Sequence, residues 1–162
     1  TIYNRNGHLY YAGGLLGGYH LSESADNVGY VKILPHDWVG SDGGSGAERY
    51  YNGPVIEDDG SNFGVKANNV NIDLFAFKDI PAGWTATAFR TYGSSNDTVT
   101  FHEYDMTDGT RTADGNTGTT NGEQITLATP ILGTSTNYVG IIINVNSTSD
   151  VIYGGYVKIE RL

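Results

Sequence analysis

Two carboxylates at alternating positions are the first residues in this sequence whose spacing could support chemistry. Glu103 and Asp105 stand in "FHEYD" and would share one face of a β-strand. Two carboxylates that face one another across a cleft can hydrolyse a glycosidic bond, one as acid and one as base or nucleophile. Alternating acids are also common on solvated strands. We therefore interpret the pair as part of an exposed face and keep a small β-sandwich hydrolase as an alternative.

The residue patterns of nucleophilic catalysis are missing from the sequence. Cysteine is absent, and no G-x-S-x-G elbow is present. The four histidines stand apart, without a recognisable triad setting: His8, His20, His36 and His102. We therefore predict a protein that is not an enzyme, with no catalytic residues and no cofactor.

Calcium is the metal that the oxygen-bearing side chains would suit best. Asp and Asn cluster in "EDDGSN" (residues 57–62) and again at Asp105, Asp108 and Asp114. Neither stretch has the D-x-[DN]-x-[DN]-G spacing of a calcium loop, and Asp-Gly turns form without metal. We predict no metal ligands.

A sugar-binding platform is a further candidate, because amphipathic aromatic side chains line many binding clefts. Its candidate members are Trp38, Trp84, Tyr50 and Tyr51. Trp84 follows the turn sequence "IPAG" and would enter a strand, which favours a packing role for it. A carbohydrate-binding module therefore stays as an alternative function.

Charge and composition exclude several partners. With 18 acidic against 9 basic residues, the net charge of -9 should repel nucleic acid and anionic lipid surfaces. No run of about 18 apolar residues suggests a membrane span, and the first residues lack the pattern of a secretion signal. We expect neither nucleic acid nor membrane as a partner. Without cysteine, neither disulfides nor thiolate zinc sites can stabilise the fold.

Strand-like runs separated by turn residues dominate the second part of the chain. From Val70 onward these runs are "VNIDLFAFK", "WTATAFRTY", "TVTFHEY", "EQITLAT", "YVGIIINV" and "VIYGGYVKIE". Their spacing predicts an all-β fold, an antiparallel, jelly-roll-like β-sandwich. Residues 105–123 are predicted to form a long polar excursion with three turn pairs, Asp108-Gly109, Asp114-Gly115 and Asn121-Gly122. Two regions follow, a glycine-rich region at 1–69 with loops, short hairpins or an arm, and a β-sandwich domain at 70–162.

The last two runs are predicted to form a hairpin. If residues 146–150 are its turn, Val145 faces Val151, and pairing continues to Val139 opposite Val157. All paired residues then have odd numbers and share one face. Since burying a large aliphatic side chain stabilises by roughly 1.5–3 kcal/mol, this face must be the core face.

The even-numbered face of that hairpin is unusually apolar, with Tyr138, Ile142, Ile152 and Tyr156. These side chains could fold over the bare backbone of Gly140 and Gly154. Alternatively, they could meet a second subunit, because exposed apolar patches tend to be interaction sites. We favour the second interpretation and predict that the four residues form an oligomer interface.

Two segments resemble a known family, "KDIPAGWTATAFRTYGSSNDTVTFHEYD" and "TNYVGIIINVNSTSDVIYGGYVKIE". Over roughly residues 78–160 the chain resembles small accessory and structural virion proteins of marine tailed bacteriophages, including cyanophages. The shared features are an "IPAG" turn before a strand ending in "YGS", a long polar loop and a "TNY…IYGGYV" finish.

The resemblance implies a non-enzymatic viral structural protein, a capsid decoration or cement protein on the exterior of the virion. It also implies a homo-oligomer, with a trimer favoured, that contacts the major capsid protein or another virion protein. The alternative is a carbohydrate-binding β-sandwich module of a phage tail or collar fibre, with calcium as a candidate requirement.

Overall fold

A computed structural model of the chain describes residues 2–5, 8–11, 27–41, 54–58, 60–68 and 72–161, with side chains for 27–41, 54–58, 60–68, 72–112 and 116–161. Strands β1 (Ile2–Arg5) and β2 (His8–Tyr11) pair antiparallel as a separate two-stranded sheet. Among the helices in the described ranges, none has the length and hydropathy needed to cross a membrane.

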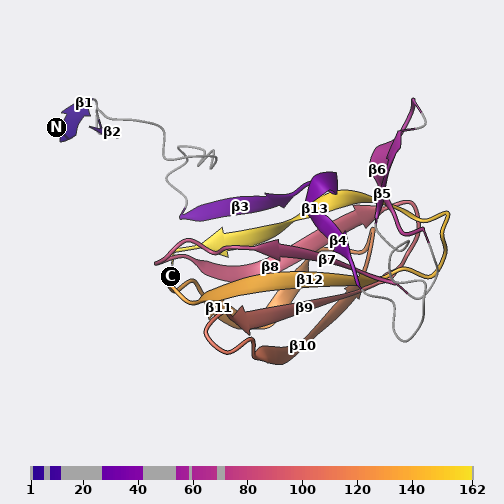
Figure 1. Cartoon of the computed structure of the whole chain (residues 1–162). Coiled ribbons are helices and arrows are strands. Elements are labelled where there is room, and N and C mark those ends of the chain that lie inside the picture. Colours follow the sequence, from indigo (N-terminus) through magenta and orange to yellow (C-terminus); the bar gives the residue numbers. More distant parts are fainter. Residues whose placement is uncertain are drawn as a thin grey trace.

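Two antiparallel sheets form a sandwich (Figure 1). The five-stranded sheet has the order β10-β9-β12-β7-β4 and consists of β4 (Trp38–Gly40), β7 (Asp73–Lys78), β9 (Thr98–Asp105), β10 (Arg111–Thr119) and β12 (Asn137–Asn144). The six-stranded sheet has the order β11-β8-β13-β6-β5, with β3 also paired to β13. Its strands are β3 (Val28–Ile33), β5 (Val55–Asp58), β6 (Phe63–Lys66), β8 (Thr85–Gly93), β11 (Ile125–Leu132) and β13 (Val151–Glu160). The predicted all-β antiparallel sandwich is confirmed.

The inner faces of both sheets supply the hydrophobic core. Phe89 of β8 stacks on Phe101 of β9 with ring centroids 5.0 Å apart, and both side chains are 0% exposed. This contact joins the two sheets, because β8 and β9 belong to different layers. Alternating apolar residues point to this interior, for example Leu74 and Ala76 of β7 and Val99 and Phe101 of β9, as the period of a half-buried strand requires.

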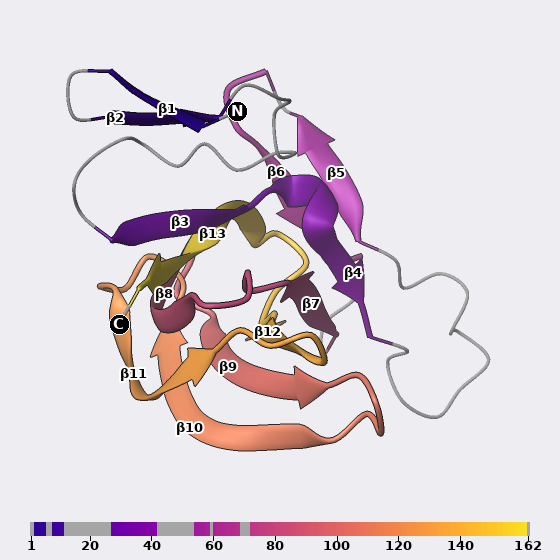
Figure 2. The ribbon, with the colours of Figure 1, turned by 90° about the vertical axis from the view of Figure 1, so that its left-hand side faces the viewer.

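The predicted hairpin between the last two strands is wrong. Strand β12 pairs with β9 and β7 in one sheet, whereas β13 pairs with β8, β3 and β6 in the other. The connection at residues 145–150 crosses from layer to layer (Figure 2). The odd-numbered aliphatics are nevertheless buried, Ile143 and Val157 both at 0% exposure, because the two sheets face one core.

A β-bulge changes the side-chain alternation within β13. The pairing with β8 shifts register between Ile152 and Gly154, and Gly154 has φ 137°. A Cβ on Gly154 would lie 2.5 Å from the carbonyl oxygen of Ile33, so glycine is needed for both conformation and space. As a result Ile152 is 0% exposed and belongs to the core together with Val157 and Ile159.

The predicted polar excursion at residues 105–123 contains a strand. Strand β10 pairs with β9 and lies at the edge of the five-stranded sheet. Its register shifts between Thr112 and Asn116, around the predicted turn pair Asp114-Gly115. The residues of this edge strand are small or polar, and its Asn116 side chain is buried and accepts a hydrogen bond of 2.9 Å from the backbone N–H of Ala128. No apolar alternation therefore marks the strand in the sequence. The two other turn pairs do form turns, with φ 71° at Gly109 and φ 62° at Asn121.

Strands from the glycine-rich region belong to the sandwich. Strand β3 pairs with β13, β4 pairs with β7, and the short 3-10 helix Pro35–Asp37 links β3 to β4 across the two layers. The change in composition near Asn69 therefore does not mark an edge of the sandwich. Residues 12–26 and 42–53 of the glycine-rich region, where loops or an arm were expected, lie outside the described residues.

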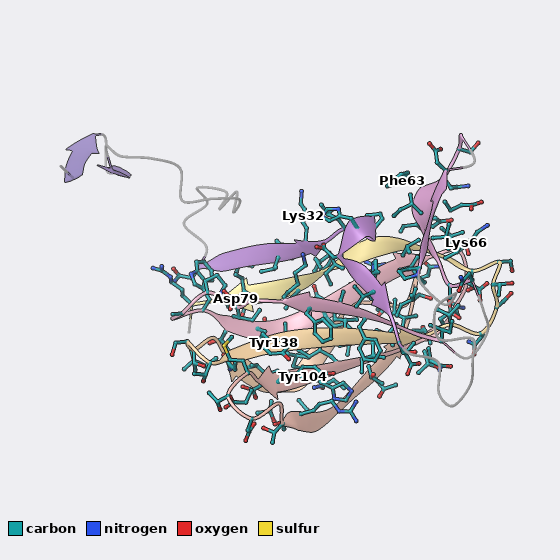
Figure 3. The ribbon with its side chains drawn as sticks, viewed as in Figure 1. Lys32, Phe63, Lys66, Asp79, Tyr104 and Tyr138 are labelled. Carbon is teal, nitrogen blue, oxygen red and sulfur yellow. The ribbon has the colours of Figure 1, made fainter. Side chains whose placement is uncertain are left out.

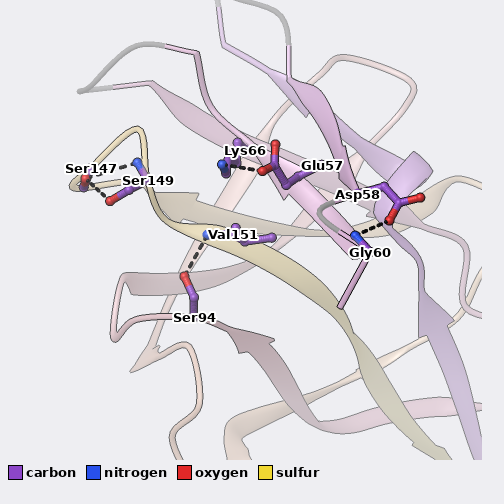
Figure 4. A network of polar contacts seen from close by, with 8 residues as sticks. All are labelled: Glu57, Asp58, Gly60, Lys66, Ser94, Ser147, Ser149 and Val151. Carbon is purple, nitrogen blue, oxygen red and sulfur yellow. Dashed lines mark hydrogen bonds and ion pairs between the residues drawn. The ribbon is translucent and has the colours of Figure 1, made fainter. Parts of the chain in front are cut away.

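Strands β5 and β6 form a ribbon that extends away from the sandwich (Figure 1). An ion pair of 2.8 Å between Lys66 Nζ and Glu57 Oε1 crosses this ribbon (Figure 4). On the neighbouring loop, the Ser94 hydroxyl accepts a hydrogen bond of 2.9 Å from the backbone N–H of Val151, where the crossover connection ends. Val151, the first residue of β13, is therefore paired with Lys66 of the ribbon and hydrogen-bonded to Ser94.

Candidate functional site

The four residues predicted as an oligomer interface do not share a surface. Tyr138 and Ile142 lie on the outer side of the five-stranded sheet, and Tyr156 lies on the outer side of the six-stranded sheet. Ile152 is in the core. Ile142 is only 8% exposed within the single chain, so its neighbours already cover it. One interface made by all four residues is therefore wrong, because the hairpin that would have aligned them does not form.

Aromatic side chains gather on the outer surface of the five-stranded sheet. This cluster, called the aromatic face, consists of Phe75, Phe77, His102, Tyr104 and Tyr138. Three neighbouring strands supply it, since β12 lies between β7 and β9. The register places Tyr138 directly opposite Tyr104, and places Gly140 between Phe77 and His102.

The rings of the aromatic face contact one another. Tyr104 and Tyr138 are stacked with centroids 5.2 Å apart and an interplanar angle of 7° (Figure 3). Phe77 meets both tyrosines edge to face, at 5.6 Å from Tyr104 and 5.8 Å from Tyr138. Aromatic pairs at such distances stabilise by about 0.5–1.5 kcal/mol beyond their buried area. The cluster is therefore held in place before any ligand binds.

Gly140 forms the floor of the aromatic face. A Cβ at this position would lie 2.5 Å from Cε2 of Tyr104 and 3.2 Å from Cδ1 and Cε1 of Phe77. Two rings from opposite neighbouring strands thus fold down over one bare backbone position. This covering of a glycine by aromatic rings was one of the two sequence interpretations, although the rings come from β7 and β9 instead of β13.

Polar groups border the aromatic face and remain able to bind a ligand. Threonines at cross-strand positions continue the same outer surface: Thr98, Thr100, Thr117 and Thr119. The phenol hydroxyls of Tyr104 and Tyr138 make no hydrogen bond with another residue of the described part of the chain. Nδ1 of His102 lies 3.3 Å from the carbonyl oxygen of Thr112, so a neutral imidazole donates there and keeps Nε2 as an acceptor.

The carboxylates considered for catalysis serve as structural acceptors. Glu103 Oε1 accepts a hydrogen bond of 2.6 Å from the side-chain amide of Asn137. Asp105 Oδ1 accepts from both the backbone N–H and the hydroxyl of Thr107, at 2.8 and 2.7 Å. The two acids therefore hold different loops, and the structure does not bring them to one reacting centre.

The aspartates considered for calcium also stabilise turns. Asp108 Oδ1 accepts hydrogen bonds from the backbone N–H and hydroxyl of Thr110, which lower the pKa of its carboxyl group. Asp58 Oδ1 accepts from the backbone N–H of Gly60 at 3.0 Å (Figure 4). Within the described ranges no group of three or more His, Cys, Asp or Glu side chains could hold a metal ion.

The tryptophans do not form a sugar platform. Trp38 is 3% exposed and Trp84 is 8% exposed, and the Arg161 guanidinium covers the Trp84 ring at 5.0 Å. Tyr50 and Tyr51 lie outside the described residues. Sequence reasoning missed the actual aromatic face, although alternate aromatic positions in "DLFAFK" and "FHEY" were the available signal.

Comparison with known proteins finds similarity among solved structures. No protein-family model matches the chain, and no curated protein matches it. Among solved structures, the chain is similar to the xylan-binding module CBM15 at 14% sequence identity and a TM-score of 0.41. The match covers 82% of this chain and 95% of that module. At this TM-score the likeness says nothing about what the present chain binds.

Proposed function

We propose that this protein is a non-catalytic binding module that holds an uncharged polysaccharide on the aromatic face. The observation that supports the proposal is the stacked pair of Tyr104 and Tyr138, which Phe77 and the floor at Gly140 hold in place. This is the carbohydrate-binding alternative derived from the sequence, with different residues at the site.

Sugar rings have apolar C–H faces and polar edges, and the aromatic face offers surfaces for both. Phe77 is 43% exposed and presents apolar area, while the tyrosine hydroxyls and His102 Nε2 present hydrogen-bonding groups. Binding on an open sheet surface lacks the enclosure of a deep pocket. We expect a dissociation constant of about 1 µM to 1 mM, which corresponds to roughly -8 to -4 kcal/mol.

Tyr138→Ala tests the proposal. The variant removes one ring of the stacked pair, and we expect at least about a tenfold loss of affinity, equal to about 1.4 kcal/mol. Isothermal titration calorimetry should be run with oligosaccharides of the neutral polymer that binds best among xylan, mannan and β-glucan. Affinity electrophoresis against the three polymers would select it.

The matched control is Phe63→Ala. Phe63 is an aromatic residue with 56% exposure on the β5–β6 ribbon, away from the aromatic face (Figure 3). Its replacement should leave affinity unchanged. The proposal is wrong if the wild type binds none of the three polymers, or if both variants lose affinity equally.

The β5–β6 ribbon supports a second candidate function, assembly into a homo-oligomer as in a virion structural protein. Val55, Ile56 and Phe63 on this ribbon are 50%, 48% and 56% exposed. Ile56 and Phe63 share one face of the projecting ribbon, and Val55 lies on the other face. Large exposed apolar side chains on a projecting ribbon form the kind of surface that a partner covers. A trimer on a capsid exterior, in contact with the major capsid protein, stays a proposal on this basis.

Phe63→Asp tests assembly. If the ribbon joins subunits, the wild type should have a multiple of the 17.4 kDa chain mass in light scattering, and the variant should have the monomer mass. A charge placed in an apolar contact is costly, so dissociation should be complete at micromolar concentration. Leu132→Asp, which places the same carboxylate at another exposed apolar position away from the ribbon, is the control and should leave the mass unchanged. A monomeric wild type would rule this candidate out.

A further inference from the structure

The outer surface of the six-stranded sheet has a second aromatic group in which tyrosines alternate with cations. This group, called the tyrosine–cation face, consists of Tyr30, Lys32, Arg90, Tyr92 and Tyr156. In the register of the sheet, Tyr156 lies directly between Lys32 of β3 and Arg90 of β8. The Tyr30 ring meets Tyr156 edge to face at 5.1 Å, and the Arg90 guanidinium lies 4.9 Å from the Tyr92 centroid.

The two cations of this face have no counter-charge among the residues that the structure describes. Neither Lys32 nor Arg90 forms an ion pair within the described part of the chain, and Arg90 Nε is buried without a hydrogen-bond acceptor. The neighbouring Lys158, by contrast, is paired with Glu160 at 2.6 Å, and this contact raises its pKa. Carboxylates outnumber cations 18 to 9 in this protein, so unpaired cations on both sides of one tyrosine are an unexpected arrangement.

We infer that the tyrosine–cation face binds an acidic polysaccharide, one whose sugar units bear carboxylate or sulfate groups. The sugar ring would pack on Tyr156 and Tyr30, and the acidic groups would pair with Lys32 and Arg90. Adjacent strands are about 4.8 Å apart, which puts the backbones of the two cations roughly 10 Å from one another with Tyr156 between them. Arginine binds carboxylate and sulfate-like groups through paired N–H donors.

The negative net charge of the protein does not prevent this binding. Charges separated by more than about 8 Å are largely screened at physiological ionic strength, so the local cations decide the sign of the interaction. Tyr30 is 55% exposed and Tyr92 is 37% exposed, and Figure 3 shows Lys32 pointing away from the sandwich. The face is thus open to a polymer in solution.

A sugar suits this surface better than a folded protein partner. Interfaces between proteins bury a well-packed core depleted of charge. Here charged side chains alternate with tyrosines across three strands, so no continuous apolar centre exists among the five residues. The site lies on the opposite sheet from the aromatic face and does not rest on the proposed function.

The test measures binding of an oligogalacturonide by isothermal titration calorimetry, with its methyl ester as the probe that lacks charge. We expect the acid form to bind at low salt, and to weaken as sodium chloride is raised. The methyl ester should bind at least about tenfold more weakly. Equal binding of the two forms would overturn the proposal.

Arg90→Gln and Lys32→Gln locate the binding. Each variant should lower the affinity for the acid form by about tenfold, the lower end of the range for a hydrogen bond to a charged group. Lys32 is exposed, so its variant keeps the fold even if Arg90→Gln perturbs it. Arg111→Gln removes the same charge on the other sheet, opposite Tyr104, and should leave the affinity unchanged.

Two further results would contradict the proposal. If Arg111→Gln weakens binding as much as Arg90→Gln, the interaction follows net charge and no site exists on this face. If poly-glutamate binds as tightly as the oligogalacturonide, the face recognises an acidic peptide instead of a sugar. Neither result affects neutral polysaccharide binding, which Tyr138→Ala tests separately on the other sheet.

Discussion

Phe89→Ala is expected to lower the free energy of unfolding by about 3–5 kcal/mol. Phe89 is 0% exposed, and its ring stacks on Phe101 of the opposite sheet at 5.0 Å. The substitution therefore leaves a cavity between the layers and removes the aromatic contact that joins them. Since single domains are stable by about 5–15 kcal/mol, the loss is a large part of the total.

Urea unfolding followed by circular dichroism measures this effect. The transition midpoint should fall while its slope stays the same, as expected when the unfolded state does not change. Leu132→Ala is the control, because Leu132 is 56% exposed and its replacement should stay within about 0.5 kcal/mol. In a double-mutant cycle, Phe101→Ala should couple to Phe89→Ala by at least about 0.5 kcal/mol. Additive losses would contradict the contact across the sheets.

Asp97→Ala is expected to destabilise the protein by at least about 2 kcal/mol, because it removes a buried carboxylate that accepts three hydrogen bonds. Asp97 is 1% exposed. Its Oδ1 accepts from the backbone N–H and side-chain amide of Asn146, at 3.0 and 3.1 Å, and its Oδ2 accepts from the Ser95 hydroxyl at 3.0 Å. Its backbone N–H donates to Thr120 Oγ1 at 2.8 Å, so this one residue connects three loops at one end of the sandwich.

The comparison variants separate the lost acceptor from a change of charge. Asp97→Asn keeps an oxygen for Asn146, and a rotated Ser95 hydroxyl can accept from the new amide, so its loss should be about half that of the alanine variant. Asp150→Ala removes an acidic side chain from the crossover connection that Asp97 contacts, and should have little effect. Thermal unfolding monitored by circular dichroism ranks the three. Equal losses for Asp97→Ala and Asp150→Ala would show that the buried carboxylate does not hold the loops.

Alternation along the chain predicted six strands of the sandwich correctly, because the buried side of a strand is visible in its own residues. It did not predict strand neighbours. The odd-numbered aliphatics of β12 and β13 are buried whether the strands pair or face one another across the core, so both arrangements fit the same pattern. Strand β10 was missed for the opposite reason, since its residues are small or polar and show no apolar alternation.

The aromatic face could not be assembled from single strands. Tyr138 and Ile142 were recognised as outward-facing, but their neighbours Phe77 and Tyr104 depend on β12 lying between β7 and β9. Regular alternation predicts that Ile152 points outward, but the bulge at Gly154 inverts the alternation and Ile152 is buried. No residue type in the sequence marks that inversion. The strand order and the bulge determine which residues form the aromatic face. The alternation of residues within a single strand gives information about neither.

Strands β12 and β13 have a consequence for how the nascent polypeptide folds. Each is the middle strand of its sheet, yet both follow all the other strands in the chain. During synthesis, β7 and β9 are made before β12, the strand that lies between them in the sheet. Strand β8 is likewise made before its partner β13. The five-stranded sheet cannot be completed before Asn144 has been synthesised, and the six-stranded sheet cannot be completed before Glu160 has been synthesised. Folding therefore depends on contacts between distant residues and is expected to be slow.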